Sequence, residues 1–243
     1  MADRIRPSDR IRPLAALRGI RGLIQDPDDT KLVFDIISAL SGKSGKRLFA
    51  RFESTETGAR LLADRPELLA RLSDRESLLE LPVGTLGRTY AEFMGREQIS
   101  AEGLVGASEE GGTGQDPDLS PERQWFGMRL RDMHDLWHVV SGYNRDLVGE
   151  ASLLAFTYAQ TRNRGIGLIV AAAWWRAGQD HPEVRPIIRE GYRRGKRAEW
   201  LPGQDWEALL EQPLETVRSR LGLGTPPSYV EMRSDGAPVL SAS

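Results

Sequence analysis

The sequence has no cysteine and only three histidines among its 243 residues. Without thiols the chain can form neither a disulfide nor a thiolate metal site, so any bound metal has to be held by histidine and carboxylate groups. Long apolar runs are missing as well. The most apolar segment, residues 166–175, is far shorter than the roughly 20 residues that span a bilayer. Any membrane contact is therefore expected to be peripheral.

The chain also lacks a strong excess of charge of either sign. The formal net charge is −2, with 28% charged and 40% apolar residues, which is the balance of an ordinary globular protein. We therefore expect no nucleic-acid partner. The first charged residues are not followed by the apolar segment of a secretory signal, and the absence of cysteine fits a reducing compartment.

Apolar residues recur at helical spacing along most of the chain, and alternating strand patterns are nearly absent. We expect an all-α fold, a multi-helix, bundle-like single domain over residues 1–243, with a metal site between two consecutive helices. A Gly-rich stretch near 107–119 predicts a flexible connection within that domain. The principal helices are expected at residues 14–23, 29–42, 86–96, 120–141, 146–162, 165–177 and 182–197.

Two of the three histidines lie in the segment His134-Asp135-x-x-His138, and Glu150 follows after eleven intervening residues. On a helix the first three side chains lie on roughly one face, and a turn at Gly142 would bring Glu150 back to the same point. Two imidazoles and two carboxylates make a plausible divalent metal site, with Asp135 either a ligand or a partner that orients a histidine. The alternative is a set of hydrogen-bonded residues at a half-buried helix surface.

This pattern resembles the signature of the coenzyme Q (ubiquinone) biosynthesis protein four family. The residues that carry the resemblance are His134-Asp135-x-x-His138-x11-Glu150, the intervening Gly142 and Gly149, Trp137, and the closing segment Pro213-Leu214-Glu215-x-x-Arg218. The similarity extends over most of the chain, closely within the motif and loosely outside it.

The resemblance implies a fold, a site and a function. Members are all-helical, bind zinc at the motif and lie on the membrane, where they handle polyprenylated quinone precursors. They are associated with oxidative removal of the ring carboxyl group at carbon one. His134, Asp135, His138 and Glu150 would then bind Zn, or iron or another divalent metal. The implied partners are a polyprenylated quinone precursor or other isoprenoid lipid and other ubiquinone-biosynthesis proteins. The implied location is the cytoplasm at the inner face of the membrane, with a homodimer as a further option.

Two other functions fit the residues. A non-enzymatic scaffold would bind prenylated lipid and gather other biosynthetic proteins at the membrane. A metal-dependent phosphohydrolase would use the His-Asp pair, but it usually needs a further upstream histidine, and none precedes His134. We therefore rank the phosphohydrolase last.

Other features have ordinary and functional interpretations. Small and bulky apolar residues alternate in the helices after Glu150, as in plain core packing or in a groove for an isoprenoid tail. The basic run Arg185–Arg197 is either a solvated face or a site for a carboxylate, a phosphate or a membrane. The basic residues near Leu14 and Leu17 in the N-terminal helix are likewise either a solvated helix face or a surface that contacts an anionic bilayer. His181 is expected to be a capping or surface residue.

Overall fold

The computed structural model describes residues 11–26, 29–101 and 119–233. Within these ranges every regular element is a helix, and the only strand-like pairing is an isolated bridge between Thr85 and Pro213. The predicted all-α fold is confirmed. The Gly-rich connection predicted near 107–119 lies, except for Leu119, outside the described residues.

The helices follow the apolar periodicity of the sequence. They are α1 (Pro13–Gln25), α2 (Thr30–Ser41), α3 (Ser44–Glu53), α4 (Glu56–Asp64), α5 (Leu68–Ser73), α6 (Arg75–Glu80), α7 (Leu86–Glu97), α9 (Pro121–Asp132), α10 (His134–Ser141), α11 (Leu147–Thr161), α12 (Arg164–Asp180), α13 (Val184–Arg197), the 3₁₀ turn η2 (Leu201–Gly203), α14 (Trp206–Leu209) and α15 (Leu214–Arg220).

Several helix starts are set by local capping. Asp29 accepts a hydrogen bond from the backbone N–H of Leu32 at 3.0 Å, and Ser120 caps α9 immediately before Pro121. Such side-chain oxygens satisfy backbone N–H groups that have no partner inside the helix. These starts agree with the sequence prediction to within one residue.

The single helix predicted over residues 120–141 is wrong in one respect. Met133 interrupts it, so that α9 ends at Asp132 and α10 begins at His134. The N–H of Met133 bonds to both Arg129 and Arg131, which tightens the last turn, and the side chain is fully buried. Because no proline or glycine marks this position, the break is produced by packing, which local sequence signals do not report.

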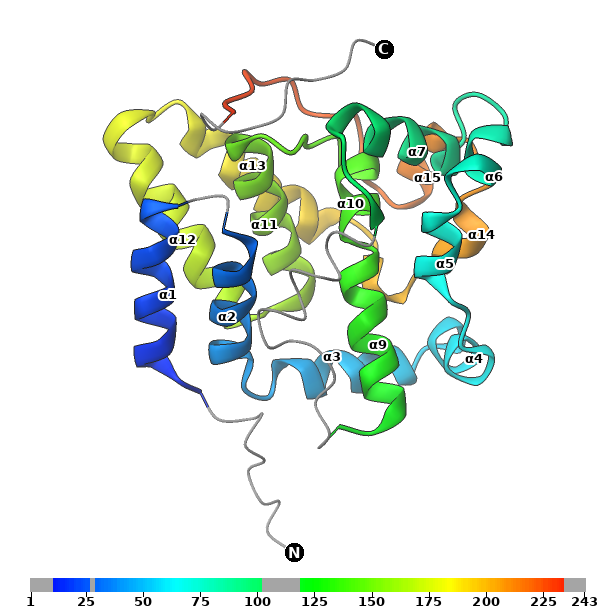
Figure 1. Cartoon of the computed structure of the whole chain (residues 1–243), viewed down its shortest axis with the longest axis horizontal. Coiled ribbons are helices and arrows are strands. Elements are labelled where there is room, and N and C mark those ends of the chain that lie inside the picture. The colour runs from blue at the N-terminus through cyan, green and yellow to red at the C-terminus, as the bar shows by residue number, and fades with distance from the viewer. Residues whose placement is uncertain (1–10, 27–28, 102–118, 234–243) are drawn as a thin grey trace, which may run out of the picture.

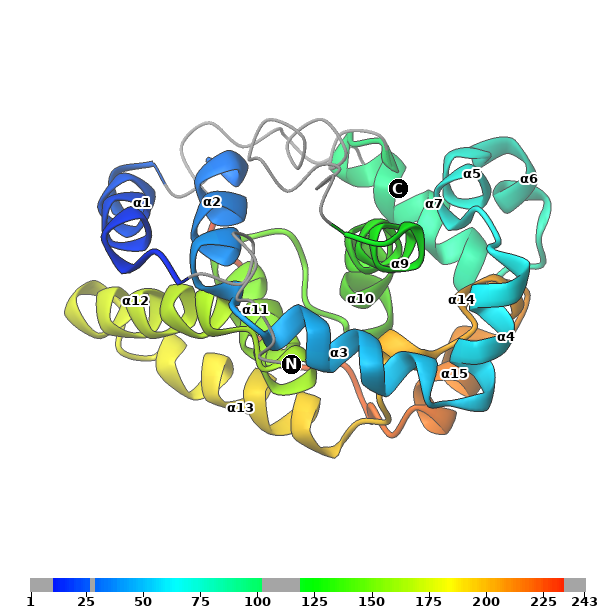
Figure 2. The ribbon, with the colours of Figure 1, turned by 90° about the horizontal axis from the view of Figure 1, so that it is seen from below.

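The helices form two groups joined by α9 and α10. In Figure 1, α1, α2, α11, α12 and α13 lie on one side, and α4 to α7 lie with α14 and α15 on the other. Figure 2 shows α12 between the pair α1 and α2 and the helix α13. The contact of α11 with α13 is close, because a Cβ at Gly191 would lie 2.3 Å from the carbonyl oxygen of Ser152. Glycine there allows the two backbones to touch.

The largest buried cluster lies where the two groups meet. Met133, Leu136, Val140 and Tyr143 from the α10 region are each 0% exposed and pack within a cluster that includes residues of α7, α11, α14 and α15. Helix α10, which carries both motif histidines, is therefore anchored in the core on one side. Its other side is free to border a cavity.

Candidate metal centre

His138 is fixed in place by the chain that follows it. Its side chain is 0% exposed, and its Nδ1 lies 2.8 Å from the carbonyl oxygen of Tyr143. Since a carbonyl oxygen only accepts hydrogen bonds, Nδ1 must carry the proton. The other ring nitrogen, Nε2, points to Glu150 Oε1 at 3.4 Å and makes no hydrogen bond among the described residues. A buried nitrogen of this kind, oriented through its partner, is what a metal-binding histidine presents.

A tight turn returns the chain to this point. Gly142 ends α10 with φ +76°, a conformation that favours glycine, and a Cβ there would lie 2.5 Å from Pro226. Asp146 then caps α11 by accepting from the N–H groups of Val148 and Gly149 at 3.0 and 3.2 Å. Glu150 consequently lies in the first turn of α11, facing α10.

The structure brings three of the four predicted ligands together. His134, His138 and Glu150 each offer one ligand atom, and these atoms all lie within 4.8 Å of one another. The two imidazole rings are one helical turn apart, with centroids 4.9 Å from each other. Two imidazole nitrogens and one carboxylate, with a fourth position open, match the donor set of catalytic zinc sites. The residues present therefore fit a divalent metal ion.

Asp135, the fourth predicted ligand, lies beside His134 and outside the group of three converging residues. Its carboxylate oxygen Oδ1 lies 3.4 Å from Nδ1 of His134, and its side chain is only 9% exposed. This geometry is typical of a carboxylate that orients a histidine so that Nε2 faces the metal. Asp135 is not among the three residues that converge, and its role as a direct ligand stays a prediction.

Charges in the cluster are strongly coupled. Desolvation acts to raise the pKa of Glu150, but the nearby positive charges, that of His138 above all, outweigh it and hold that pKa at about 2. Burial acts to lower the pKa of His138, but the carboxylate of Glu150, together with Asp135 and the carbonyl of Tyr143, outweighs it, so this pKa is raised. Burial also opposes ionisation of Asp135, yet His134 lowers its pKa. The carboxylates are thus ionised at neutral pH and ready to bind a cation.

His134, Asp135 and Glu150 lie in the wall of a cavity of about 1200 Å³. This volume exceeds the roughly 300–1,000 Å³ of ordinary ligand pockets. The cavity extends from α10 and α11 to α1, α2 and α12, and its apolar lining includes Ile20, Leu23, Val33, Ile37, Leu154, Ile166 and Ile169. The helices after Glu150 therefore contribute side chains to the cavity wall as well as to the core.

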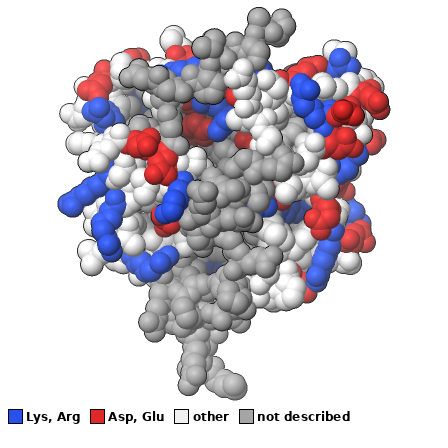
Figure 3. Space-filling view, in the orientation of Figure 1, with Lys and Arg blue, Asp and Glu red and all other residues white. Residues whose placement is uncertain are grey.

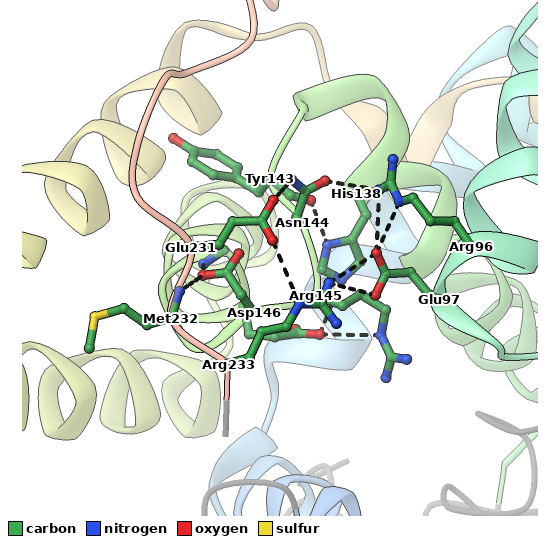
Figure 4. A network of polar contacts seen from close by, with 12 residues as sticks. Arg96, Glu97, His138, Tyr143, Asn144, Arg145, Asp146, Glu231, Met232 and Arg233 are labelled. Carbon is green, nitrogen blue, oxygen red and sulfur yellow. Dashed lines mark hydrogen bonds and ion pairs between the residues drawn. The ribbon is translucent and has the colours of Figure 1, made fainter. Parts of the chain in front are cut away.

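A C-terminal segment, residues 226–233, holds the α10–α11 turn in place (Figure 4). Tyr229 accepts a hydrogen bond from the N–H of Asn144 at 2.8 Å and donates one to Asp146 at 2.9 Å. The backbone N–H of Met232 also donates to Asp146, and the N–H of Leu147 donates to the carbonyl of Met232. Arg233 pairs with the buried carboxylate of Glu97 at 3.0 Å. Every contact joins segments far apart in the sequence.

Only part of this support can be predicted from the sequence. A helix start near Asp146 was predicted from the sequence, but the roles of Glu97, Tyr229 and Arg233 carry no local signal. The basic run Arg185–Arg197 proves mixed: Arg194 is 5% exposed and donates to the carbonyl oxygens of Ser141 and Leu223, so it is a structural residue.

His181 was expected to be a capping or surface residue. His181 follows the last residue of α12, is half exposed and lies 3.3 Å from Glu183. It borders the cavity but is not part of the histidine cluster.

In the described parts of the chain, no helix combines the length and apolar character needed to cross a bilayer. Acidic and basic side chains are interspersed on the face shown in Figure 3.

Fold and site together define an all-helical protein with a candidate divalent-metal centre in the wall of an apolar cavity. The chain belongs to the coenzyme Q (ubiquinone) biosynthesis protein Coq4 family, whose model matches residues 11–227.

Individual relatives agree with this assignment. The chain is similar to "Ubiquinone biosynthesis protein COQ4, mitochondrial" of Yarrowia lipolytica, with 27% identity over 74% of this chain and 67% of the relative. It is 30% identical to the coq4 protein of Talaromyces stipitatus over 82% of this chain and 69% of the relative. The names of these fungal relatives carry the word mitochondrial, so they do not share the cytoplasmic location predicted here.

A solved structure has the same fold. It is the crystal structure of a protein of Nostoc punctiforme, provisionally described as a ubiquinone biosynthesis protein. The TM-score is 0.65 with 24% identity, and the match covers 88% of this chain and 97% of the other. At this identity the match supports the all-helical architecture alone.

Proposed function

We propose that this protein binds a polyprenylated hydroxybenzoate or related quinone precursor and supports oxidative removal of the ring carboxyl group at carbon one. The tail would lie in the apolar cavity and the ring beside the metal centre. The observation that carries the proposal is that His134, Glu150 and the apolar side chains of α1, α2 and α12 line one and the same cavity.

Apolar surface supplies the binding energy for the tail. Each methylene group removed from water contributes about 0.8 kcal/mol, so even two isoprenoid units would give a useful affinity. A cavity larger than ordinary ligand pockets is suited to a long, flexible ligand.

The chain's own residues would position the ion and the ring. His134, His138 and Glu150 hold the metal, zinc or another divalent ion, while Asp135 and the carbonyl of Tyr143 orient the two imidazoles. When bound, such an ion acts as a Lewis acid towards a phenolate or carboxylate oxygen. The ring–carboxyl bond breaks, the carboxyl leaves as carbon dioxide and a hydroxyl from water or dioxygen replaces it. This replacement removes two electrons, so dioxygen or a partner oxidoreductase has to accept them.

The proposed location is the membrane surface. Leu14 and Leu17 are 73% and 53% exposed on α1, and the exposed Arg18 and Arg21 lie on the same helix, which has no acidic residue. An exposed apolar and basic helix suits peripheral contact with an anionic bilayer. Other ubiquinone-biosynthesis proteins would meet the protein there.

Complementation tests this function. In a host that lacks its own member of the family, the wild-type protein should restore ubiquinone. A Glu150→Gln variant should not restore it, and the host should accumulate a prenylated intermediate that retains its carboxyl group, as measured by mass spectrometry of extracted lipids. Glu183→Gln, a change at an exposed carboxylate beside His181, is the matched control and should restore ubiquinone fully.

Two outcomes would contradict the proposal. Restoration by a folded Glu150→Gln variant would favour the scaffold, which needs no metal ligand. A wild-type protein that restores ubiquinone but carries no isoprenoid after purification from that host would argue against the cavity as the lipid site.

A further inference from the structure

Arg145 lies in the wall of the cavity, beside the metal centre. Its Nε is 3.5 Å from Glu150 Oε1, the oxygen that also faces His138. The Nε is buried and makes no hydrogen bond to the described parts of the chain, although a third of the side chain is exposed. In Figure 4 its two terminal nitrogens point away from the other residues drawn. Among the described residues, the planar donor fork of this arginine has no hydrogen-bond partner, and the side chain lines the cavity.

Most other arginines of the cavity wall are neutralised by carboxylates outside the metal centre. Arg131 pairs with Asp132 at 2.7 Å, Arg176 with Asp180, and Arg233 with Glu97. Within the described ranges Arg145 has only Glu150, which it shares with His138. Arg123 also borders the cavity and has no side-chain partner within residues 11–26, 29–101 and 119–233, but it precedes His134 by about three helical turns.

If a metal ion were bound, even less negative charge would be left to neutralise Arg145. Glu150 would then give its negative charge to the ion, and Asp135 is engaged with His134. A divalent cation and Arg145 together carry three positive charges against the two negative charges of these carboxylates. The centre keeps one positive charge at the end of an apolar cavity, where charges interact strongly. A ligand group with one negative charge would neutralise this remaining positive charge.

We propose that Arg145 forms a carboxylate subsite next to the metal centre, which selects amphiphiles with an ionised carboxyl group on the ring. The guanidinium fork matches a carboxylate in a bidentate geometry. The inference rests on the proposed function, since it assigns the orientation of the ligand in the same cavity. The carboxyl-bearing end of the ring lies at Arg145, and the tail extends towards α1 and α2.

Binding of two synthetic probes tests the subsite without any turnover. The probes are 3-geranyl-4-hydroxybenzoate and 2-geranylphenol, which lacks only the carboxyl group, and their affinities are measured by calorimetry. The wild-type protein should bind the carboxylate roughly 10- to 100-fold more tightly, the range of a charge-assisted hydrogen-bonded pair. Arg145→Gln should bring this ratio close to one, and Arg145→Lys should keep an intermediate ratio because it retains charge without the fork.

Arg123→Gln is the matched control and should keep the wild-type ratio. All measurements are repeated on metal-free protein, so that loss of the ion in a variant cannot imitate loss of the subsite. Unchanged discrimination in Arg145→Gln would overturn the proposal, as would metal-free wild-type protein that binds both probes equally. Wild-type protein that binds neither probe would reject the proposed function itself, whereas equal binding by the loaded wild type would reject only the subsite.

Discussion

Nε2 of His138 lies 3.4 Å from Oε1 of Glu150, across the turn that joins α10 to α11. The two residues come from different helices, and each is oriented by its own backbone environment: His138 by the carbonyl of Tyr143, and Glu150 by the capped start of α11. The close approach of a buried imidazole and a carboxylate, with His134 completing the group, is the basis of the predicted metal centre.

If the predicted site binds the metal, the metal content of the protein should depend on His138 and not on His181. His138→Ala removes a fully buried residue that we predict to be a ligand, and it should lower the affinity for zinc by more than the roughly 10- to 100-fold seen when outer partners are lost. His181→Ala is the control, because that residue is half exposed and outside the cluster. Elemental analysis of the purified proteins checks this, and equal metal content in both variants would reject the site.

Gly149, next to Glu150, and Gly127, in α9, should respond differently to replacement by alanine. A Cβ at Gly149 would lie 1.9 Å from the backbone oxygen of Asn144 and 2.6 Å from the hydroxyl of Tyr229. Gly149→Ala should therefore destabilise the protein by about 1–3 kcal/mol or more, since the backbone has to shift. Gly127→Ala, in the exposed middle of α9 with no neighbour within 4 Å, should stabilise it by about 0.5–1 kcal/mol. Urea unfolding measures both, and a tolerated Gly149→Ala would contradict the packing described.

Tyr229→Phe should loosen the turn that presents Glu150. The change removes a hydroxyl that bonds both the N–H of Asn144 and the buried carboxylate of Asp146, with an expected cost of about 1–3 kcal/mol. Tyr192→Phe, whose hydroxyl accepts one exposed hydrogen bond from Arg162, should change stability much less. The comparison is made by chemical denaturation; similar losses in the two variants would show that the C-terminal segment does not brace the turn.

The metal-free protein should show a pH-dependent contribution from Glu150 and His138. The pKa of Glu150 falls from its ordinary 4.5 to about 2 in the folded state, so its contribution is present above pH 4.5 and is lost as the pH falls towards 2. The pKa of His138 is raised above its ordinary 6.5, so its contribution is present below 6.5 and is lost as the pH rises through the folded value.

The pair should therefore stabilise the metal-free fold most between about pH 4.5 and 6.5. The measurement is the difference in unfolding free energy between wild type and Glu150→Gln, in the presence of a chelator, at pH 3, 5.5 and 8. A difference that does not vary among these three pH values would show that the two groups are not coupled.

Much of the site could be predicted because its parts are local. The spacing of His134 and His138 puts them on one helical face, and the group that could hold a metal ion contains both. Helix starts at Asp29, Ser120 and Asp146 follow from capping, which acts over two or three residues. The interruption between α9 and α10 at Met133 was not predicted, because it comes from burial of that residue and has no signal in the neighbouring sequence.

The sequence by itself determined the all-helical fold, the helix that carries the two histidines and the ligand types available without cysteine. Only the tertiary structure decided that Asp135 lies against His134, that Arg194 is buried, and that Tyr229 and Arg233 brace the site from more than eighty residues away. The physical reason is range. Helix periodicity and capping are set by neighbours within a turn or two, whereas the cavity, its charges and the return of Glu150 depend on how distant helices pack against one another.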